Sequence, residues 1–150
     1  MEDCTYEFDK RNMDIKYYTD DYTYVMSDGT VIEGRDKALD AVKGIYATFT
    51  AYTHIPYYLV CTEVNDGWEM IGQAHMFVNL PGNPVAGEAK VKDPREGKEW
   101  DLKMPGAFRF HYAKQGGDIF MKRTEVMADN SGVMMMMIKR NLIDPKSLGL

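Results

Sequence analysis

Apolar and polar residues alternate most regularly in the stretch from residue 100 to residue 129. Residues 108–112 read FRFHY, which is the period-two pattern of a strand with one apolar face. Residues 115–118 read QGGD, a composition that favours a tight reversal of the chain. Residues 119–127 then have the composition of a returning strand. The stretch therefore predicts a β-hairpin.

The returning strand carries one carboxylate among apolar neighbours. Strict alternation places Glu125 on the same face as Ile119, Met121 and Met127, and Asp129 follows where the strand should end. We interpret this hairpin as the back wall of a pocket.

The first third of the chain changes its hydrophobic period. Residues 2–18 have apolar side chains at mixed spacing, consistent with one or two short helices. Residues 22–26 favour a strand, and a turn leads from them into a short returning strand at residues 30–32. From residue 38 to residue 49 the apolar positions recur at helical spacing, and Asp36 lies where an acidic residue favours a helix start.

The rest of the chain is predicted to be mostly β. Residues 54–64 form one strand, and an NDG turn connects them to a long strand at residues 68–80. Residues 81–99 are rich in Gly, Pro, Lys and Glu and are expected to form an exposed loop, with at most a short strand around residues 86–91. After the hairpin, residues 132–140 form a final helix.

This order of elements predicts an α+β fold in a single domain spanning residues 1–150. A curved antiparallel sheet wrapped around helices is the economical architecture for it. Such a sheet forms a cone whose mouth admits a small molecule.

Composition excludes several classes of function. The chain has a net charge of −5 and no run of basic residues, which argues against nucleic acid and against anionic membranes as partners. No apolar stretch approaches the roughly 20 residues that span a bilayer, and the polar N-terminus does not resemble a signal peptide. Two cysteines, Cys4 and Cys61, are too few for a disulfide framework, so we expect a reduced, cytoplasmic protein.

The sequence contains no motif for a cofactor. It has no Gly-rich phosphate loop, dinucleotide fingerprint or Ser-elbow motif, and its three histidines are not at metal-ligand spacing. We therefore expect neither a cofactor nor a metal.

Several short motifs resemble NTF2-like, SnoaL-like proteins. They cover about residues 8–143 and are DDYTY at 20–24, DG at 28–29, VIEGRDKAL at 31–39, NDGWEMIG at 65–72, FRF at 108–110 and EVMAD at 125–129. The resemblance implies a cone-shaped α+β barrel that is often dimeric through the face of its sheet. It also implies that the protein is a cofactor-free isomerase or cyclase of fungal secondary metabolism. Its substrate would then be a small hydrophobic molecule, namely a polycyclic polyketide, terpenoid or alkaloid.

The chain departs from some enzymes of this family. Its first helix is shorter than usual, so one wall of the pocket is open or is borrowed from a partner chain. Gly106 lies about where the ketosteroid isomerase has its oxyanion-hole aspartic acid. His54 matches the first histidine of scytalone dehydratase, but the second falls near Leu80, which has no imidazole.

The first candidate pair for catalysis is Glu125 and Arg35. In fungal cofactor-free isomerases of this family an arginine and a carboxylate do this work, and these two residues look like the match. Glu125 would move a proton while Arg35 stabilises the oxygen that gains charge. The alternative is a structural ion pair, or two unrelated surface charges.

A second candidate is His54, which could act as general acid or base in a dehydratase with Tyr58 on the same strand face. The alternative is a hydrogen-bonded core histidine. Asp101 is expected at the rim of the pocket, or else simply exposed. Aromatic residues that could line the pocket, or could be ordinary core, are Tyr24, Tyr46, Tyr58, Trp100 and Phe108. A third hypothesis is a non-catalytic ligand-binding or dimerisation module.

Overall fold

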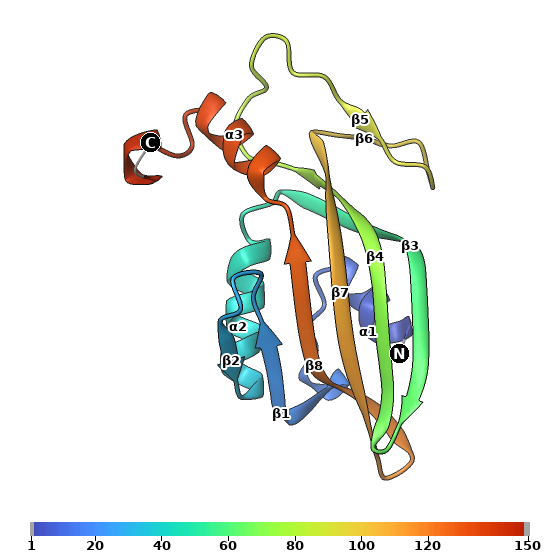
Figure 1. Ribbon diagram of the computed structural model, residues 1–150. Coiled ribbons are helices and arrows are strands. Elements are labelled where there is room, and N and C mark those ends of the chain that lie inside the picture. The colour runs from blue at the N-terminus through green and yellow to red at the C-terminus, as the bar shows by residue number, and fades with distance from the viewer. Residues whose placement is uncertain (1, 149–150) are drawn as a thin grey trace.

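The computed structural model describes residues 2–148 of the chain (Figure 1). The elements are, in order, α1 (Glu2–Asp9), η1 (Ile15–Tyr17), β1 (Tyr18–Val25), β2 (Val31–Glu33), α2 (Arg35–Tyr46), β3 (Ala51–Val64), β4 (Gly67–Asn79), β5 (Val91–Lys92), β6 (Glu99–Trp100), β7 (Leu102–Gln115), β8 (Asp118–Ala128), α3 (Ser131–Lys139) and η2 (Pro145–Leu148). The predicted helices 38–49 and 132–140 correspond to α2 and α3. The β7–β8 hairpin corresponds to the alternating stretch that dominates the sequence pattern.

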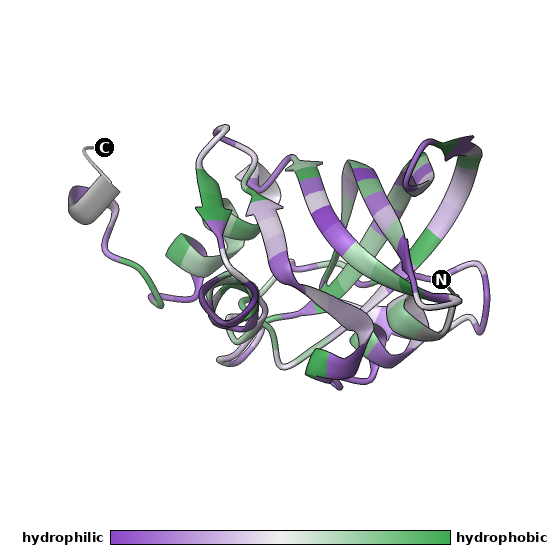
Figure 2. Ribbon diagram, turned by 90° about the horizontal axis from the view of Figure 1, so that it is seen from below, coloured by the Kyte–Doolittle hydropathy of each residue, from purple (hydrophilic) through white to green (hydrophobic). Residues whose placement is uncertain are grey.

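Six strands form one curved sheet in the order β2-β1-β8-β7-β4-β3. Helices α1 and α2 lie on the same side of this sheet, which Figures 1 and 2 show from two directions. The predicted cone-shaped α+β fold is confirmed. The sheet is mixed rather than antiparallel, because β1 pairs in parallel with β8. A parallel pair needs a long connection, and here the chain from β1 to β8 includes α2 and the other long strands.

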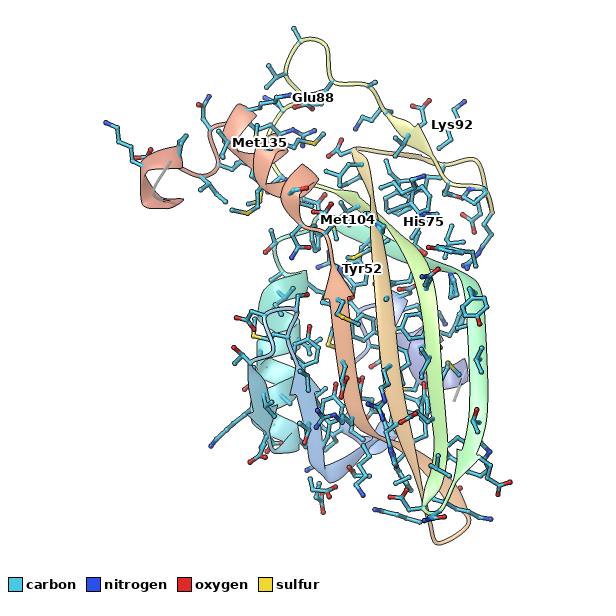
Figure 3. All side chains as sticks on the ribbon, in the orientation of Figure 1. Tyr52, His75, Glu88, Lys92, Met104 and Met135 are labelled. Carbon is cyan, nitrogen blue, oxygen red and sulfur yellow. The ribbon has the colours of Figure 1, made fainter. Side chains whose placement is uncertain are left out.

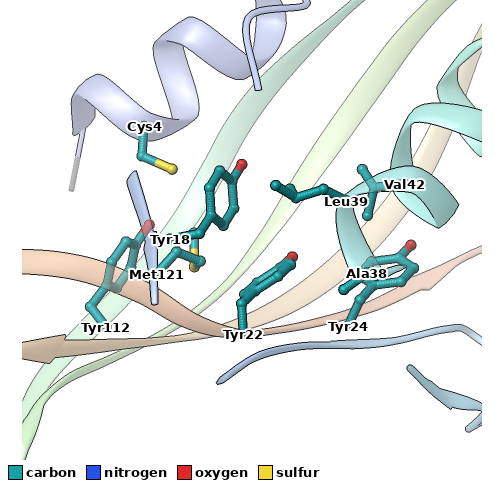
Figure 4. Packing of buried hydrophobic residues seen from close by; sticks show 9 residues of the cluster. All are labelled: Cys4, Tyr18, Tyr22, Tyr24, Ala38, Leu39, Val42, Tyr112 and Met121. Atoms are coloured by element: carbon teal, nitrogen blue, oxygen red, sulfur yellow. The ribbon is translucent and has the colours of Figure 1, made fainter. Parts of the chain in front are cut away.

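The core divides into two clusters on the concave side of the sheet. The larger one joins α1, α2, β1, β7 and β8, and Figure 4 shows its buried members: Cys4, Tyr18, Tyr22, Tyr24, Ala38, Leu39, Val42, Tyr112 and Met121. The second lies where α3 meets the sheet and contains Phe49, Tyr52, Met76, Val78, Leu80, Met104 and Val133. The spacing of Ala38, Leu39 and Val42 explains why one face of α2 is buried.

β-Bulges in β8 and β3 decide which side chains of these two strands reach the concave side. In β8, Tyr112 pairs with Met121 but His111 pairs with Arg123, so Lys122 is an extra residue without a partner. An extra residue reverses the alternation beyond it. Met121 is therefore buried in the core, whereas Glu125 lies on the outer face opposite Arg109. The prediction that Met121 and Glu125 share a face was wrong for this reason.

The second bulge lies in β3. Its register shifts between Pro56, which pairs with Ala74, and Tyr58, which pairs with Gln73. Tyr57 is the extra residue, so Tyr58 lies on the outer face and is 56% exposed. The prediction that Tyr58 shares a face with His54 was wrong.

The region 81–101 is more ordered than an exposed loop. The two-residue strands β5 and β6 pair antiparallel and cover the end of the sheet where β3 begins. Trp100 is 3% exposed, and its ring centroid lies 6.5 Å from that of Phe77. Figure 3 shows His75 and Tyr52 at this same end of the sheet, beside the hairpin that carries Lys92.

In the part of the chain that the structure describes, no helix is long and apolar enough to cross a membrane. No group of three or more His, Cys, Asp or Glu side chains is placed to hold a metal ion among those residues.

Candidate functional site

His54 lies near the start of β3, on the concave side of the sheet. It is two residues from the buried Tyr52 and pairs across the sheet with Met76. The side chain of His54 is 27% exposed, so it is neither sealed in the core nor free in solvent.

The carboxylate of Asp9, the last residue of α1, holds this imidazole. Asp9 Oδ1 lies 2.6 Å from His54 Nδ1. Asp9 Oδ2 accepts hydrogen bonds from the backbone N–H of His54 at 3.0 Å and from Thr53 Oγ1 at 3.2 Å. A carboxylate can only accept, so Nδ1 carries a proton, and in the neutral form of the ring Nε2 is the basic nitrogen.

The hydroxyl of Tyr46, at the end of α2, faces that basic nitrogen. Tyr46 Oη lies 3.1 Å from His54 Nε2. Burial, together with the neighbouring Tyr24 and Tyr52, raises the pKa of Tyr46 well above its usual value. Tyr46 therefore keeps its proton, and it donates to Nε2 when the ring is neutral. Asp9, His54 and Tyr46 form a chain from carboxylate to imidazole to phenol.

Aromatic rings surround this chain of three residues. The ring centroid of Phe8 lies 5.8 Å from that of His54 and 4.8 Å from that of Tyr46. Tyr52 lies 5.9 Å from His54, and burial raises the pKa of Tyr52 to about 12 despite the opposing charge of Arg11. These rings lower the local polarity, which strengthens the hydrogen bonds among the three residues.

Apolar side chains continue the concave face beyond His54. Gly72 of β4 lets Leu59 and Phe108 fold over it, because a Cβ at Gly72 would lie 2.7 Å from both side chains. Phe108 stacks on Phe110 with ring centroids 4.5 Å apart. Leu59 is 51% exposed, so this wall offers apolar surface to a ligand.

One surface cavity lies beside the site, and another lies away from it near the β7–β8 turn. One of about 170 Å³ lies between the start of β3 and the β5–β6 hairpin, where Thr53 and Arg95 are among its lining residues. The other, of about 380 Å³, is lined by Arg35 and Phe120 among others. Neither is lined by His54, so access to Nε2 depends on the partly exposed edge of the imidazole.

The structure does not bring Arg35 and Glu125 together. Arg35 begins α2 and forms ion pairs with Asp20 and Asp36 at the molecular surface. Glu125 lies on the outer face of the sheet and pairs with Arg123 at 2.6 Å. The expectation that this pair meets inside the cone is corrected, because the bulge at Lys122 turns Glu125 outward.

Asp101 is neither at a pocket rim nor exposed, since its side chain is 3% exposed. It accepts hydrogen bonds from Leu80 N at 2.8 Å and from Arg140 Nη1 at 2.9 Å, and Lys90 also contacts it. Burial alone would raise the pKa of Asp101, but these donors outweigh burial and lower it to about 2. Asp101 thus anchors the end of α3 and has no contact with His54.

The five predicted aromatic residues separate into groups. Tyr46 contacts His54, and Phe108 forms part of the concave wall. Tyr24 is buried in the larger core cluster. Trp100, the last residue of β6, is buried, and its Nε1–H donates to Asp93 at 2.8 Å. Together with Tyr58 on the outer face, three of the five therefore lie away from His54.

Asp9 is not among the site residues predicted from the sequence. This residue lies 45 positions before His54, and no spacing rule connects the end of a short helix with an edge strand. The sequence shows only that Asp9 is an acidic residue next to Phe8 in an amphipathic segment. This pattern is common in surface helices and does not indicate a catalytic role.

No protein-family profile matches this sequence, and no curated protein matches it. Solved structures do match its fold. The hexachlorocyclohexane dehydrochlorinase LinA-type3 from Novosphingobium barchaimii is 16% identical with a TM-score of 0.62, covering 85% of this chain and 80% of its own.

Two further structures agree with this. A scytalone dehydratase-like protein from Novosphingobium aromaticivorans is 13% identical with a TM-score of 0.61, covering 86% of this chain and 78% of its own. A SnoaL-like polyketide cyclase from Jannaschia is 16% identical with a TM-score of 0.53. The match covers 81% of this chain and 73% of the cyclase chain. The resemblance seen in the sequence is thus confirmed at the level of the fold, and the chain has the NTF2-like fold.

Proposed function

We propose that this protein is a cofactor-independent lyase that eliminates a leaving group from a small hydrophobic molecule, with His54 as the general base. The observation that carries the proposal is the 2.6 Å contact between Asp9 Oδ1 and His54 Nδ1, which leaves Nε2 basic. A positioned base of this kind contributes about 10²–10⁴-fold to the rate.

The three residues can complete an elimination without any other reactant. When the Tyr46 hydroxyl turns its hydrogen from Nε2 to the leaving group, His54 Nε2 takes a proton from a carbon atom, and the electrons of that C–H bond form a double bond to the adjacent carbon. The leaving group departs from the adjacent carbon, and a hydroxide leaves as water after Tyr46 donates its proton. After loss of water, the imidazolium returns a proton to the Tyr46 phenolate, which restores both side chains. After loss of a halide anion, the imidazolium releases its proton to solvent. Asp9 stabilises the imidazolium while it exists.

The names of two structural neighbours support an elimination. A dehydrochlorinase and a scytalone dehydratase-like protein are both named for the loss of a small molecule from a substrate. The apolar wall of Leu59 and Phe108 suits a hydrophobic substrate.

The same proton transfer supports a second candidate, an isomerase or cyclase. In that reaction Tyr46 or His54 returns the proton to the substrate instead of releasing a leaving group. The hydrogen bond between Tyr46 and Nε2 favours this candidate too, because it places a proton donor next to the base. We also keep as proposals a fungal secondary metabolite as the substrate, a homodimer and a cytoplasmic location.

The test is turnover of a substrate panel by matched variants. Hydroxylated cyclic ketones would be screened by the absorbance of the conjugated product, and halogenated alicyclic compounds by the release of halide. We expect His54→Ala and Asp9→Asn to lose about 10²–10⁴-fold in kcat/KM. Arg35→Ala and Glu125→Gln are the matched controls and should retain wild-type turnover. Full activity in His54→Ala, or loss only in the two controls, would contradict the proposal.

A further inference from the structure

The end of α1 is fastened to the start of β3. Tyr52 Oη donates to the carbonyl of Phe8 at 3.0 Å, and the Arg11 guanidinium donates to the carbonyl of Phe49. Asp9 adds its three contacts to Thr53 and His54, described above. The carboxylate that orients the imidazole is thus also one of the ties that hold the helix down.

Helix α1 has little stability of its own. It contains eight residues, and isolated helices shorter than about 12–15 residues are marginal in water. Cys4 is 7% exposed and packs into the larger core cluster, whereas Tyr6 is 64% exposed. The order of α1 therefore depends on its docking to the sheet.

Docked α1 also covers the imidazole. Phe8 lies against both His54 and Tyr46, at the ring distances given above. Release of α1 would remove Phe8 from this position and would carry Asp9 away from His54 in the same movement.

We propose that α1 is a lid that carries the carboxylate of the site. The closed lid assembles the Asp9–His54 pair, and the open lid separates the pair and uncovers the concave face around His54. The importance of this motion for turnover rests on the proposed function, whereas the motion itself does not.

The chain contains a reporter of the motion. Cys4 is on α1, and its thiol points toward Tyr18 in the closed position (Figure 4). Burial raises the pKa of the Cys4 thiol, so it reacts slowly while the lid is closed. Cys61 is exposed, and Cys61→Ser leaves Cys4 as the single thiol of the chain. The labelling rate of Cys4 by an aromatic disulfide reagent then measures the population of the open lid.

All variants are made in the Cys61→Ser background. Asp9→Asn should raise the Cys4 labelling rate by about 10–100-fold, since it weakens hydrogen bonds to a charged group. Tyr52→Phe should raise it by several-fold, because it removes one tie. Glu7→Gln is the matched control and should leave the rate unchanged, since the contacts of Glu7 are with Lys10 and Asn12 of its own segment.

The urea dependence of labelling separates lid opening from unfolding of the whole chain. Opening of α1 exposes little surface, so the labelling rate should rise only slightly with urea concentration. Global unfolding exposes the whole core, so labelling by that route would depend on urea as steeply as equilibrium unfolding does. The proposal is overturned if the labelling slope equals that of global unfolding, or if neither Asp9→Asn nor Tyr52→Phe labels faster than Glu7→Gln. Tyr52→Phe decides the matter if Asp9→Asn does not fold. Labelling as expected, combined with full turnover by His54→Ala, would keep the lid and reject the proposed function.

Discussion

At the scale of single residues, the Tyr46 hydroxyl and the Asp9 carboxylate act on opposite nitrogens of one imidazole. Asp9 determines which nitrogen carries the proton, and Tyr46 contacts the other nitrogen, where chemistry would occur. The two partners come from different helices, so the imidazole on β3 depends on the docking of both α1 and α2.

Removing the Tyr46 hydroxyl tests its role as a proton donor. We expect Tyr46→Phe to lower kcat by about 10–100-fold, which corresponds to the loss of one charge-assisted hydrogen bond of about 1.5–3 kcal/mol. Steady-state kinetics would measure the change, with KM affected little. Tyr58→Phe is the control, because Tyr58 is on the outer face of the sheet. Equal rates for Tyr46→Phe and wild type would exclude the donor role.

The residue scale is where prediction from sequence was weakest. His54 was a candidate because it matches the first histidine of scytalone dehydratase in the family resemblance. Its partner Asp9 was not, because the contact crosses 45 positions and depends on how α1 docks. Arg35 and Glu125 were favoured through a resemblance, and their separate positions with different ion-pair partners followed from tertiary structure that alternation does not encode.

At the scale of elements, two extra residues reverse the faces of β3 and β8. The local pattern predicted the strands of the six-stranded sheet and their turns, because the hydrophobic pattern and the NDG and QGGD turns are local signals, but it did not predict the β5–β6 pair. A bulge is set by pairing with a neighbouring strand, so the sequence of one strand alone does not reveal it. The parallel pairing of β1 with β8 was missed for the same reason, since it joins distant segments.

Deletion of Lys122 tests the bulge in β8. Without the extra residue, either Glu125 must turn inward or Met121 must turn outward, and each outcome is costly. We expect the free energy of unfolding to fall by at least about 3 kcal/mol, measured by urea denaturation.

Lys122→Ala is the matched control for that deletion. It keeps the backbone length and removes only the surface ion pair of Lys122 with Asp66, a change of within about 0.5–1 kcal/mol. A deletion variant as stable as Lys122→Ala would show that the bulge does not determine the faces of β8.

At the scale of the whole molecule, the concave face of the sheet carries His54, and the outer face carries charged side chains. The outer face carries ion pairs between β4, β7 and β8, including Arg109 with Glu69 at 2.6 Å. The end of the sheet is closed by α3, which the buried Arg140 connects to Asp101 and Glu88. These charges support the architecture and lie apart from the proposed chemistry.

The Asp101–Arg140 contact predicts a loss of stability in acid. The folded-state pKa of Asp101 is about 2, below its ordinary value, so the ionised form stabilises the fold above about pH 4. This stabilisation is lost as the pH falls from about 4 through 2, and it amounts to about 2 kcal/mol.

Urea denaturation at a series of pH values would measure this effect. The free energy of unfolding of Asp101→Asn should be lower than that of the wild type at neutral pH, and it should fall less steeply between about pH 4 and pH 2. Parallel pH curves for the two proteins would contradict the account.

The most direct test of the central claim is the protonation pattern of the His54 ring, read from ¹⁵N NMR at about pH 8 with His54→Gln used for assignment. The account predicts a neutral imidazole with its proton on Nδ1 and an unprotonated Nε2, and a loss of this preference in Asp9→Asn. A proton on Nε2 in the wild type, or the same pattern in Asp9→Asn, would contradict it.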